Sequence, residues 1–174
     1  MVPLSQAPDG LLRWTVRPGR SFVLEAEGEE AGRLGFSGKG GSLAKGETAH
    51  GEWTFKREGF LHPRITVRAT DSEQNCGSFT LSANGGGKFN LGRGEEYTFT
   101  TPGWLDSHWS FHRGPFEVVR FSRDGSSADV EIMMRSVDPT TLSILILLGW
   151  YAPLLAADEE AVIKTTVALG AAIG

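Results

Sequence analysis

The chain has 174 residues, of which 40% are apolar and 22% are charged, and 17 Lys and Arg against 21 Asp and Glu give a net charge of -4. A chain of this length can bury a full hydrophobic core within one domain. The charge balance excludes a generally basic nucleic-acid-binding protein, whose phosphate contacts need clustered Lys and Arg, so no nucleic-acid partner is expected. The single cysteine, Cys76, excludes an internal disulfide framework and a zinc site of several cysteines.

Between residues 11 and 135, apolar residues alternate with polar ones in short segments that are separated by glycine-containing turns. This two-residue period is typical of strands with one buried and one solvated face. About twelve such segments and no helical period predict a mainly β protein whose antiparallel sheet is closed into a barrel or folded into a sandwich. The residues expected to face inward include Trp14, Phe22, Leu34, Trp53, Phe55, Phe79, Phe89, Phe99 and Phe111.

The segment from Pro139 to Ala157 contains 19 residues without a charge. Asp138 or Thr140 is suited to cap the start of a helix here. A helix that is apolar on all sides lies in a large core or spans a membrane, and a span needs about 20 apolar residues. The flanks give no positive-inside signal, and a second, milder helical stretch is expected over residues 159–172.

The number of strands favours the buried alternative for this apolar segment. About eight strands already enclose a barrel that their own side chains fill, so twelve leave a lumen for another apolar element. A helix about 10 Å across is a suitable filler. We therefore expect one domain over residues 1–174, an antiparallel closed barrel in which the inward aromatic residues pack on the central C-terminal helix at Ile144, Leu145, Leu147, Leu148, Trp150 and Tyr151.

Several segments in this order carry a likeness to a known family: Arg13-Trp14-Thr15-Val16, Phe22-Val23-Leu24, and Val130-Glu131-Ile132 followed by Leu145-Ile146-Leu147-Leu148-Gly149-Trp150-Tyr151. Over residues 11–157 the chain resembles the tubby C-terminal-like superfamily, which includes tubby domains, phospholipid scramblases and LURP-one-related proteins. The resemblance is one of architecture and element order. It implies a closed β-barrel around a central hydrophobic helix, in a family whose activities include phosphoinositide binding and association with lipid or nucleic acid.

Tubby-type phosphoinositide binding uses clustered basic residues, and the resemblance points to Lys56, Arg64 and Arg68 as the residues that would bind an anionic headgroup. These residues alternate with buried positions of two neighbouring predicted strands, so they are expected to face outward together. Arginine suits charge-assisted contacts to phosphate particularly well. The alternative is a solvated strand face on which these cations pair with Glu52 and similar neighbours.

The scramblase calcium segment corresponds here to a stretch with Asp124, Asp129 and Glu131. An EF-type loop needs oxygen ligands at its first, third, fifth and twelfth positions. Counted from Asp124, the fifth and twelfth positions are Ala128 and Arg135, which excludes an EF-type site. We expect neither a metal nor a cofactor.

Catalytic signatures are weak. His108 and His112 would share one face of a helix, but their setting predicts a strand, which separates them by about 13 Å and places them too far apart for one metal. An enzyme would therefore need a site assembled from distant residues, with His108, His112 or Asp106 as candidates.

Three functional hypotheses follow. The first is a non-enzymatic binding or scaffold domain that recognises a phospholipid headgroup or another anionic ligand at a membrane surface. The second is a membrane protein anchored by residues 139–157, and the third is an enzyme. The first residues lack the charged and apolar regions of a signal peptide, which indicates a cytoplasmic protein, peripheral to the membrane under the first hypothesis.

Overall fold

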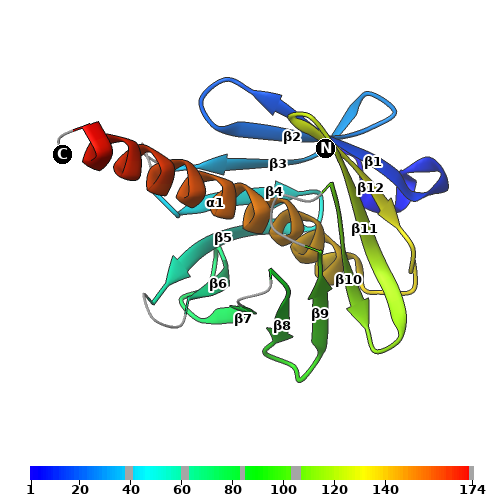
Figure 1. Cartoon of the computed structure of the whole chain (residues 1–174). Helices are drawn as coiled ribbons and strands as arrows, with labels where there is room; N and C mark the ends of the chain where they lie inside the picture. The colour runs from blue at the N-terminus through cyan, green and yellow to red at the C-terminus, as the bar shows by residue number, and fades with distance from the viewer. Residues whose placement is uncertain (38–40, 60–62, 83–84, 103–106, 173–174) are drawn as a thin grey trace.

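The dominant feature of the structure is a closed barrel of antiparallel strands with a helix through its lumen (Figure 1). The structure, a computed structural model, describes residues 1–37, 41–59, 63–82, 85–102 and 107–172, with side chains in the last of these segments described as far as Asp158. Within these residues the strands are β1 (Leu11–Arg17), β2 (Ser21–Ala26), β3 (Glu29–Phe36), β4 (Ala44–Thr48), β5 (Gly51–Glu58), β6 (Arg64–Ala69), β7 (Asn75–Leu81), β8 (Gly87–Leu91), β9 (Glu96–Thr100), β10 (His108–Arg113), β11 (Phe116–Asp124) and β12 (Ser127–Ile132). Two short 3₁₀ helices, Leu4–Gln6 and Pro8–Gly10, precede β1.

Each strand pairs with the strands before and after it in the chain, and β1 pairs with β12 to close the barrel. The closing register runs from Leu11 opposite Glu131 to Trp14 opposite Ala128. Closure pairs the edges that an open sheet would expose. The structure thus confirms the predicted mainly β, antiparallel closed barrel and decides against the sandwich.

The alternation of side chains predicted from the sequence is present in the strands. All nine residues expected to face inward are at most 8% exposed. They meet the helix α1 (Pro139–Ala172), in which every residue from Leu142 to Pro153 is buried. Stacked rings of Trp14, Trp150 and Trp109 connect β1 and β10 through the helix.

The start of α1 is held by polar contacts at one end of the barrel. Asp138 is the cap, since its Oδ2 accepts a hydrogen bond from the Thr141 amide at 3.0 Å. One turn later the buried Ser143 hydroxyl donates to the Pro139 carbonyl oxygen and accepts from the Thr48 hydroxyl of β4. These bonds fix where the helix enters the lumen.

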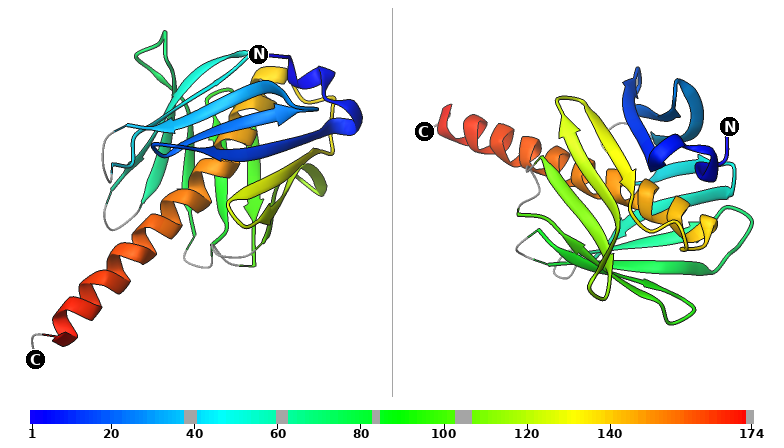
Figure 2. Two further views of the ribbon diagram at one scale, coloured as in Figure 1. Left: turned by 90° about the horizontal axis from the view of Figure 1, so that it is seen from above. Right: turned by 90° about the vertical axis from the view of Figure 1, so that its right-hand side faces the viewer.

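The expected second helix over 159–172 is not separate, because α1 continues without a break to Ala172. Asp158 and the two glutamates that follow it end the uncharged run, but Glu is a good helix former and its charge does not interrupt the backbone. In Figures 1 and 2 the last turns of the α1 ribbon extend out of one end of the barrel, which we call the mouth.

Pro153 lies inside α1, where it cannot donate a hydrogen bond to the carbonyl oxygen of Gly149. That oxygen instead accepts a hydrogen bond of 2.8 Å from the indole Nε1 of Trp109 in β10. The lack of a side chain at Gly149 also lets α1 lie close to β11, because a Cβ atom at Gly149 would lie 2.6 Å from Cε2 of Phe121. The helix and the barrel wall are therefore joined by a hydrogen bond at the point where the proline leaves an acceptor unpaired.

One helical segment, Pro139–Asp158, is long and apolar enough to span a membrane, and 78% of its most apolar window is buried inside the protein. Its apolar surface is already covered by the inward residues of the barrel. The burial agrees with the prediction that the uncharged run fills the lumen.

Candidate functional site

The predicted headgroup-binding residues lie on the outer face of β5 and β6. Lys56, Arg64 and Arg68 are all exposed, whereas their strand neighbours Phe55 and Val67 are fully buried. The register places Lys56 opposite Thr66, which lies between the two arginines on β6. Lys56 is therefore diagonal to both arginines, at a spacing of roughly 7–8 Å between backbone positions.

The acidic neighbours of this face are partly engaged with other cations. Glu52 lies 2.6 Å from the Nζ of Lys45 on β4 rather than against one of the three predicted residues. Arg64 contacts Glu58 across the β5–β6 pair, with 3.5 Å between Nη2 and Oε2 and 59% of the arginine side chain exposed. In the part of the chain that the structure describes, Lys56 and Arg68 have no carboxylate within 4.0 Å.

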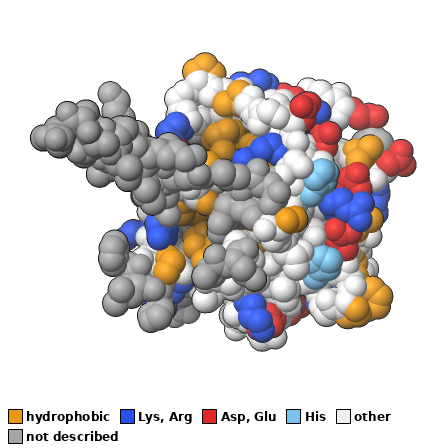
Figure 3. Space-filling model, in the orientation of Figure 1, with side chains coloured by type: hydrophobic (Ala, Val, Ile, Leu, Met, Phe, Trp, Pro, Cys, Tyr) orange, Lys and Arg blue, Asp and Glu red, His pale blue; other side chains and the backbone are white. Residues whose placement is uncertain are grey.

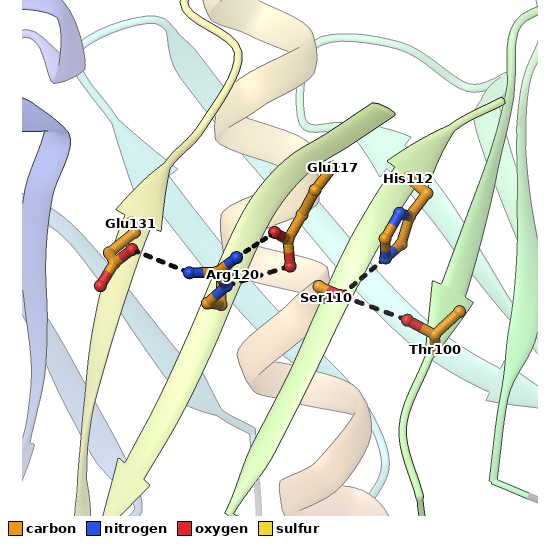
Figure 4. A network of polar contacts seen from close by, with 6 residues as sticks. All are labelled: Thr100, Ser110, His112, Glu117, Arg120 and Glu131. Carbon is orange, nitrogen blue, oxygen red and sulfur yellow. Dashed lines mark hydrogen bonds and ion pairs between the residues drawn. The ribbon is translucent and has the colours of Figure 1, made fainter. Parts of the chain in front are cut away.

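A second polar region occupies the outer face of β9, β10 and β11. A surface pocket of about 420 Å³ is lined there by Thr100, Thr101, Pro102, His108, Trp109, Ser110, Glu117 and Arg120. The Ser110 hydroxyl lies 3.2 Å from Thr100 Oγ1 and 2.9 Å from His112 Nε2 (Figure 4). In Figure 3, histidine side chains lie beside acidic and basic ones on the face that carries these strands.

The charges beside this pocket are paired with one another. Arg120 donates through Nε and Nη2 to the Glu117 carboxylate and lies 3.5 Å from Glu131 on β12 (Figure 4). Hydrogen bonding to Arg120 lowers the pKa of Glu117 below its ordinary value, with a smaller contribution from Ser110. Arg120 is therefore already bound by two carboxylates and is poorly suited to hold an external anion.

The catalytic candidates are only partly brought together. His108 and His112 both lie on the outer face of β10, as predicted, while Asp106 is outside the described residues. Ser110 and His112 are within hydrogen-bonding distance, but the Glu117 carboxylate is bound to Arg120. A nucleophile–base–acid relay in which the acid orients the histidine is not formed by these contacts. The enzyme hypothesis stays a prediction.

The remaining sequence candidates are engaged elsewhere. Asp129 and Asp124 contact Arg13 at 2.7 Å and 3.5 Å, and Glu131 contacts Arg120. Within the described residues no group of three His, Cys, Asp or Glu is arranged to hold a metal ion. Cys76 donates to the Val67 carbonyl oxygen, and burial raises the pKa of its thiol, which disfavours the reactive thiolate.

The polar cluster around Ser110 and Glu117 was not predicted from the sequence. Alternation alone places Ser110 and His112 outward, but the partner of each residue depends on the strand register. A bulge between Phe111 and His112 shifts that register and places His112 opposite Glu117. The extra residue is Val118 on β11, where the consecutive apolar residues Val118 and Val119 interrupt the alternation and are the one signal of the bulge in the sequence.

The chain matches no protein-family model, no curated protein and no solved structure.

Proposed function

We propose that this protein is a non-enzymatic binding domain of the tubby C-terminal-like superfamily, and that it binds an anionic phospholipid headgroup at a membrane surface through Lys56, Arg64 and Arg68. The architecture, a closed barrel around a mostly buried helix, is of the tubby-like kind and supports this placement. The observation that carries the ligand proposal is the grouping of three outward cations on β5 and β6.

The spacing of the three cations suits a group that carries several negative oxygens. Two of them flank Thr66 on β6, and the third lies opposite Thr66 on β5. The Thr66 hydroxyl donates to the Lys56 carbonyl oxygen, so the side chain that separates the cations is short and held against the strand pair. A phosphate placed above Thr66 would be approached by cationic side chains from both strands.

The protein's own acids offer limited competition for these cations. The contact of Arg64 with Glu58 is long and exposed, and such surface pairs contribute about 0–1 kcal/mol. A doubly charged phosphate would displace the carboxylate because Arg binds it with charge-assisted, often bidentate hydrogen bonds. Lys56 and Arg68 have no acidic partner among the described residues to displace.

The proposal is tested by co-sedimentation of the full chain with vesicles. Wild-type protein is expected to bind vesicles that contain phosphatidylinositol phosphates and to bind neutral phosphatidylcholine vesicles weakly. Each basic residue near an anionic surface contributes about 1 kcal/mol, so a Lys56→Gln/Arg68→Gln variant should bind roughly 30-fold more weakly.

A matched control variant distinguishes binding through the β5–β6 face from an effect of the total charge of the protein. Arg17→Gln/Arg33→Gln removes the same charge from outward residues of β1 and β3, where each arginine contacts a glutamate. This control should bind anionic vesicles nearly as well as wild type. Equal loss in the two double variants, or equal binding of the wild type to neutral and anionic vesicles, would contradict the proposal.

A further inference from the structure

The mouth of the barrel holds an arginine whose surroundings are unusual for a charged side chain. Arg123 is the last residue but one of β11, and it follows the inward-facing positions Val119 and Phe121 on that strand. Its side chain is half-buried over the rings of Trp109 and Trp150, with the guanidinium carbon 5.2 Å and 5.4 Å from the two ring centroids. The arginine therefore points over the lumen rather than away from it.

Among the described residues, Arg123 has aromatic contacts but no hydrogen-bond acceptor for its guanidinium. A cation above the face of an aromatic ring is attracted by the electrons of the ring. The five N–H donors lie in the guanidinium plane, and among the described residues none of them donates to a carbonyl or carboxylate oxygen. Burial lowers the pKa of Arg123, because it removes water from the charged guanidinium.

A second arginine at the mouth, Arg20, contacts both an aromatic ring and a carboxylate. Arg20, in the turn between β1 and β2, lies with its guanidinium carbon 4.2 Å from the ring centroid of Phe36. Its Nη2 also donates to the carboxylate of Asp158 on α1. Arg20 thus has both an aromatic contact and an anion, whereas Arg123 has aromatic contacts and, among the described residues, no anion.

The neighbouring indole adds another donor without an acceptor. Trp150, which lies beneath Arg123, has a buried Nε1–H with no hydrogen-bond partner in the described part of the chain. The other indole, that of Trp109, donates to Gly149 and is satisfied. Arg123 and Trp150 thus both carry N–H donors without an acceptor among the described residues, which favours a negatively charged, oxygen-bearing ligand.

We propose that Arg123 forms a second anion site at the mouth of the barrel, which holds a phosphate group by its guanidinium edge while Trp109 and Trp150 support the guanidinium face. A planar guanidinium presents paired N–H donors that match two phosphate oxygens. The site differs from the β5–β6 face because its single cation is half-buried and stacked. The phosphate comes from a soluble phosphate or from a lipid headgroup presented to the mouth.

The two rings that contact Arg123 are tryptophans, so the intrinsic fluorescence of the protein reports on the site. Titration of the full chain with inorganic phosphate is expected to give a saturable fluorescence change. Arg123→Gln should weaken this response at least tenfold, because charged hydrogen bonds to the phosphate are lost. Arg120→Gln is the matched control: it removes an arginine from the same strand that is already bound by Glu117 and Glu131, and it should leave the response unchanged.

A conservative variant protects the test against a loss of folding. Arg123→Lys keeps the positive charge and a contact with the rings but loses the paired donors, so it should bind phosphate several-fold more weakly while melting near the wild-type temperature. No saturable response in the wild type, or wild-type affinity in either Arg123 variant, would overturn the proposal.

Vesicles with and without phosphatidic acid distinguish the two sources of phosphate. Binding to phosphatidic acid that is lost in Arg123→Gln assigns the site to a lipid headgroup, and a phosphate response without such binding assigns it to a soluble ligand. Lys56→Gln/Arg68→Gln should retain the fluorescence response to phosphate. Failure of the β5–β6 proposal is therefore visible separately from failure of this one.

Discussion

The Glu117 carboxylate accepts two hydrogen bonds from Arg120, and this contact lowers its pKa below the ordinary value of a glutamate. A carboxylate with a lowered pKa in the folded state contributes stability when the pH is above its unfolded pKa, about 4.3. That contribution is lost as the pH falls through the lowered folded pKa. The contact between Glu117 and Arg120 of β11 therefore makes part of the free energy of unfolding dependent on pH.

The variant Glu117→Gln tests this dependence. Its free energy of unfolding should be lower than that of wild type at pH 6–7, and the difference should shrink as the pH falls below about 4. Urea unfolding at several pH values measures it. Glu73→Gln, which removes an exposed acid with no ion pair in the described residues, is the control. A difference between Glu117→Gln and wild type that is constant with pH would show that the carboxylate is not held as described.

The candidate site shows which properties of a residue could be predicted from the sequence. Lys56, Arg64 and Arg68 were correctly placed on one outer face, because period-two alternation alone decides which side of a sheet a residue occupies. The partners of each cation depend on register. The pairing of Glu52 with Lys45 has no counterpart in local residue order. Arg123 continues the inward alternation of Val119 and Phe121, but its contact with two tryptophan rings depends on the helix in the lumen.

The helix α1 depends on the barrel wall at Pro153. The missing N–H of the proline leaves the Gly149 carbonyl oxygen without its helical partner, and Trp109 of β10 supplies the donor. A buried carbonyl oxygen that loses its only donor costs about 1–3 kcal/mol. The strand therefore compensates for a defect in the helix.

This compensation predicts a coupling that a double-mutant cycle measures. Trp109→Phe should lower the free energy of unfolding by about 1–3 kcal/mol beyond the loss of ring area, because the Gly149 oxygen is left unpaired. In a Pro153→Ala background the same change should cost less, since the new backbone N–H can bond to that oxygen. Additive effects of the two changes, measured by urea unfolding, would argue against the hydrogen bond as the link.

The elements themselves were largely predicted, and the one error has a clear cause. Twelve strands and a buried C-terminal helix follow from a two-residue periodicity and an uncharged run. The break expected near Asp158 was wrong because a charge ends the burial of a helix, not its backbone hydrogen bonding. Closure between β1 and β12 did not follow from alternation, which a sandwich shares, but from the need to fill a twelve-stranded lumen.

The barrel and its central helix depend on one another for stability. Burial of one large apolar side chain contributes about 1.5–3 kcal/mol. The buried apolar residues of α1 therefore contribute more than the net stability of a typical domain, about 5–15 kcal/mol. Without the helix, the lumen wall would face water.

A chain that ends at Asp138 should consequently fail to form the barrel, whereas a chain that ends at Asp158 keeps every helix residue described as buried and should fold. Circular dichroism, thermal melting and gel filtration compare the two. The shorter chain is expected to lack a cooperative transition and to aggregate. A cooperative, monomeric barrel without α1 would contradict the role assigned to the helix.

The position of α1 behind all twelve strands also sets the order in which the protein can be completed on the ribosome. Neighbouring strands can pair as they are synthesised, since every pairing except β1 with β12 joins segments close in the chain. The strands that carry the inward aromatic residues are therefore synthesised before α1, the helix that fills the lumen. The emergence of α1 from the ribosome is therefore the event that allows the nascent sheet to close, and synthesis interrupted before α1 leaves an apolar sheet with open edges.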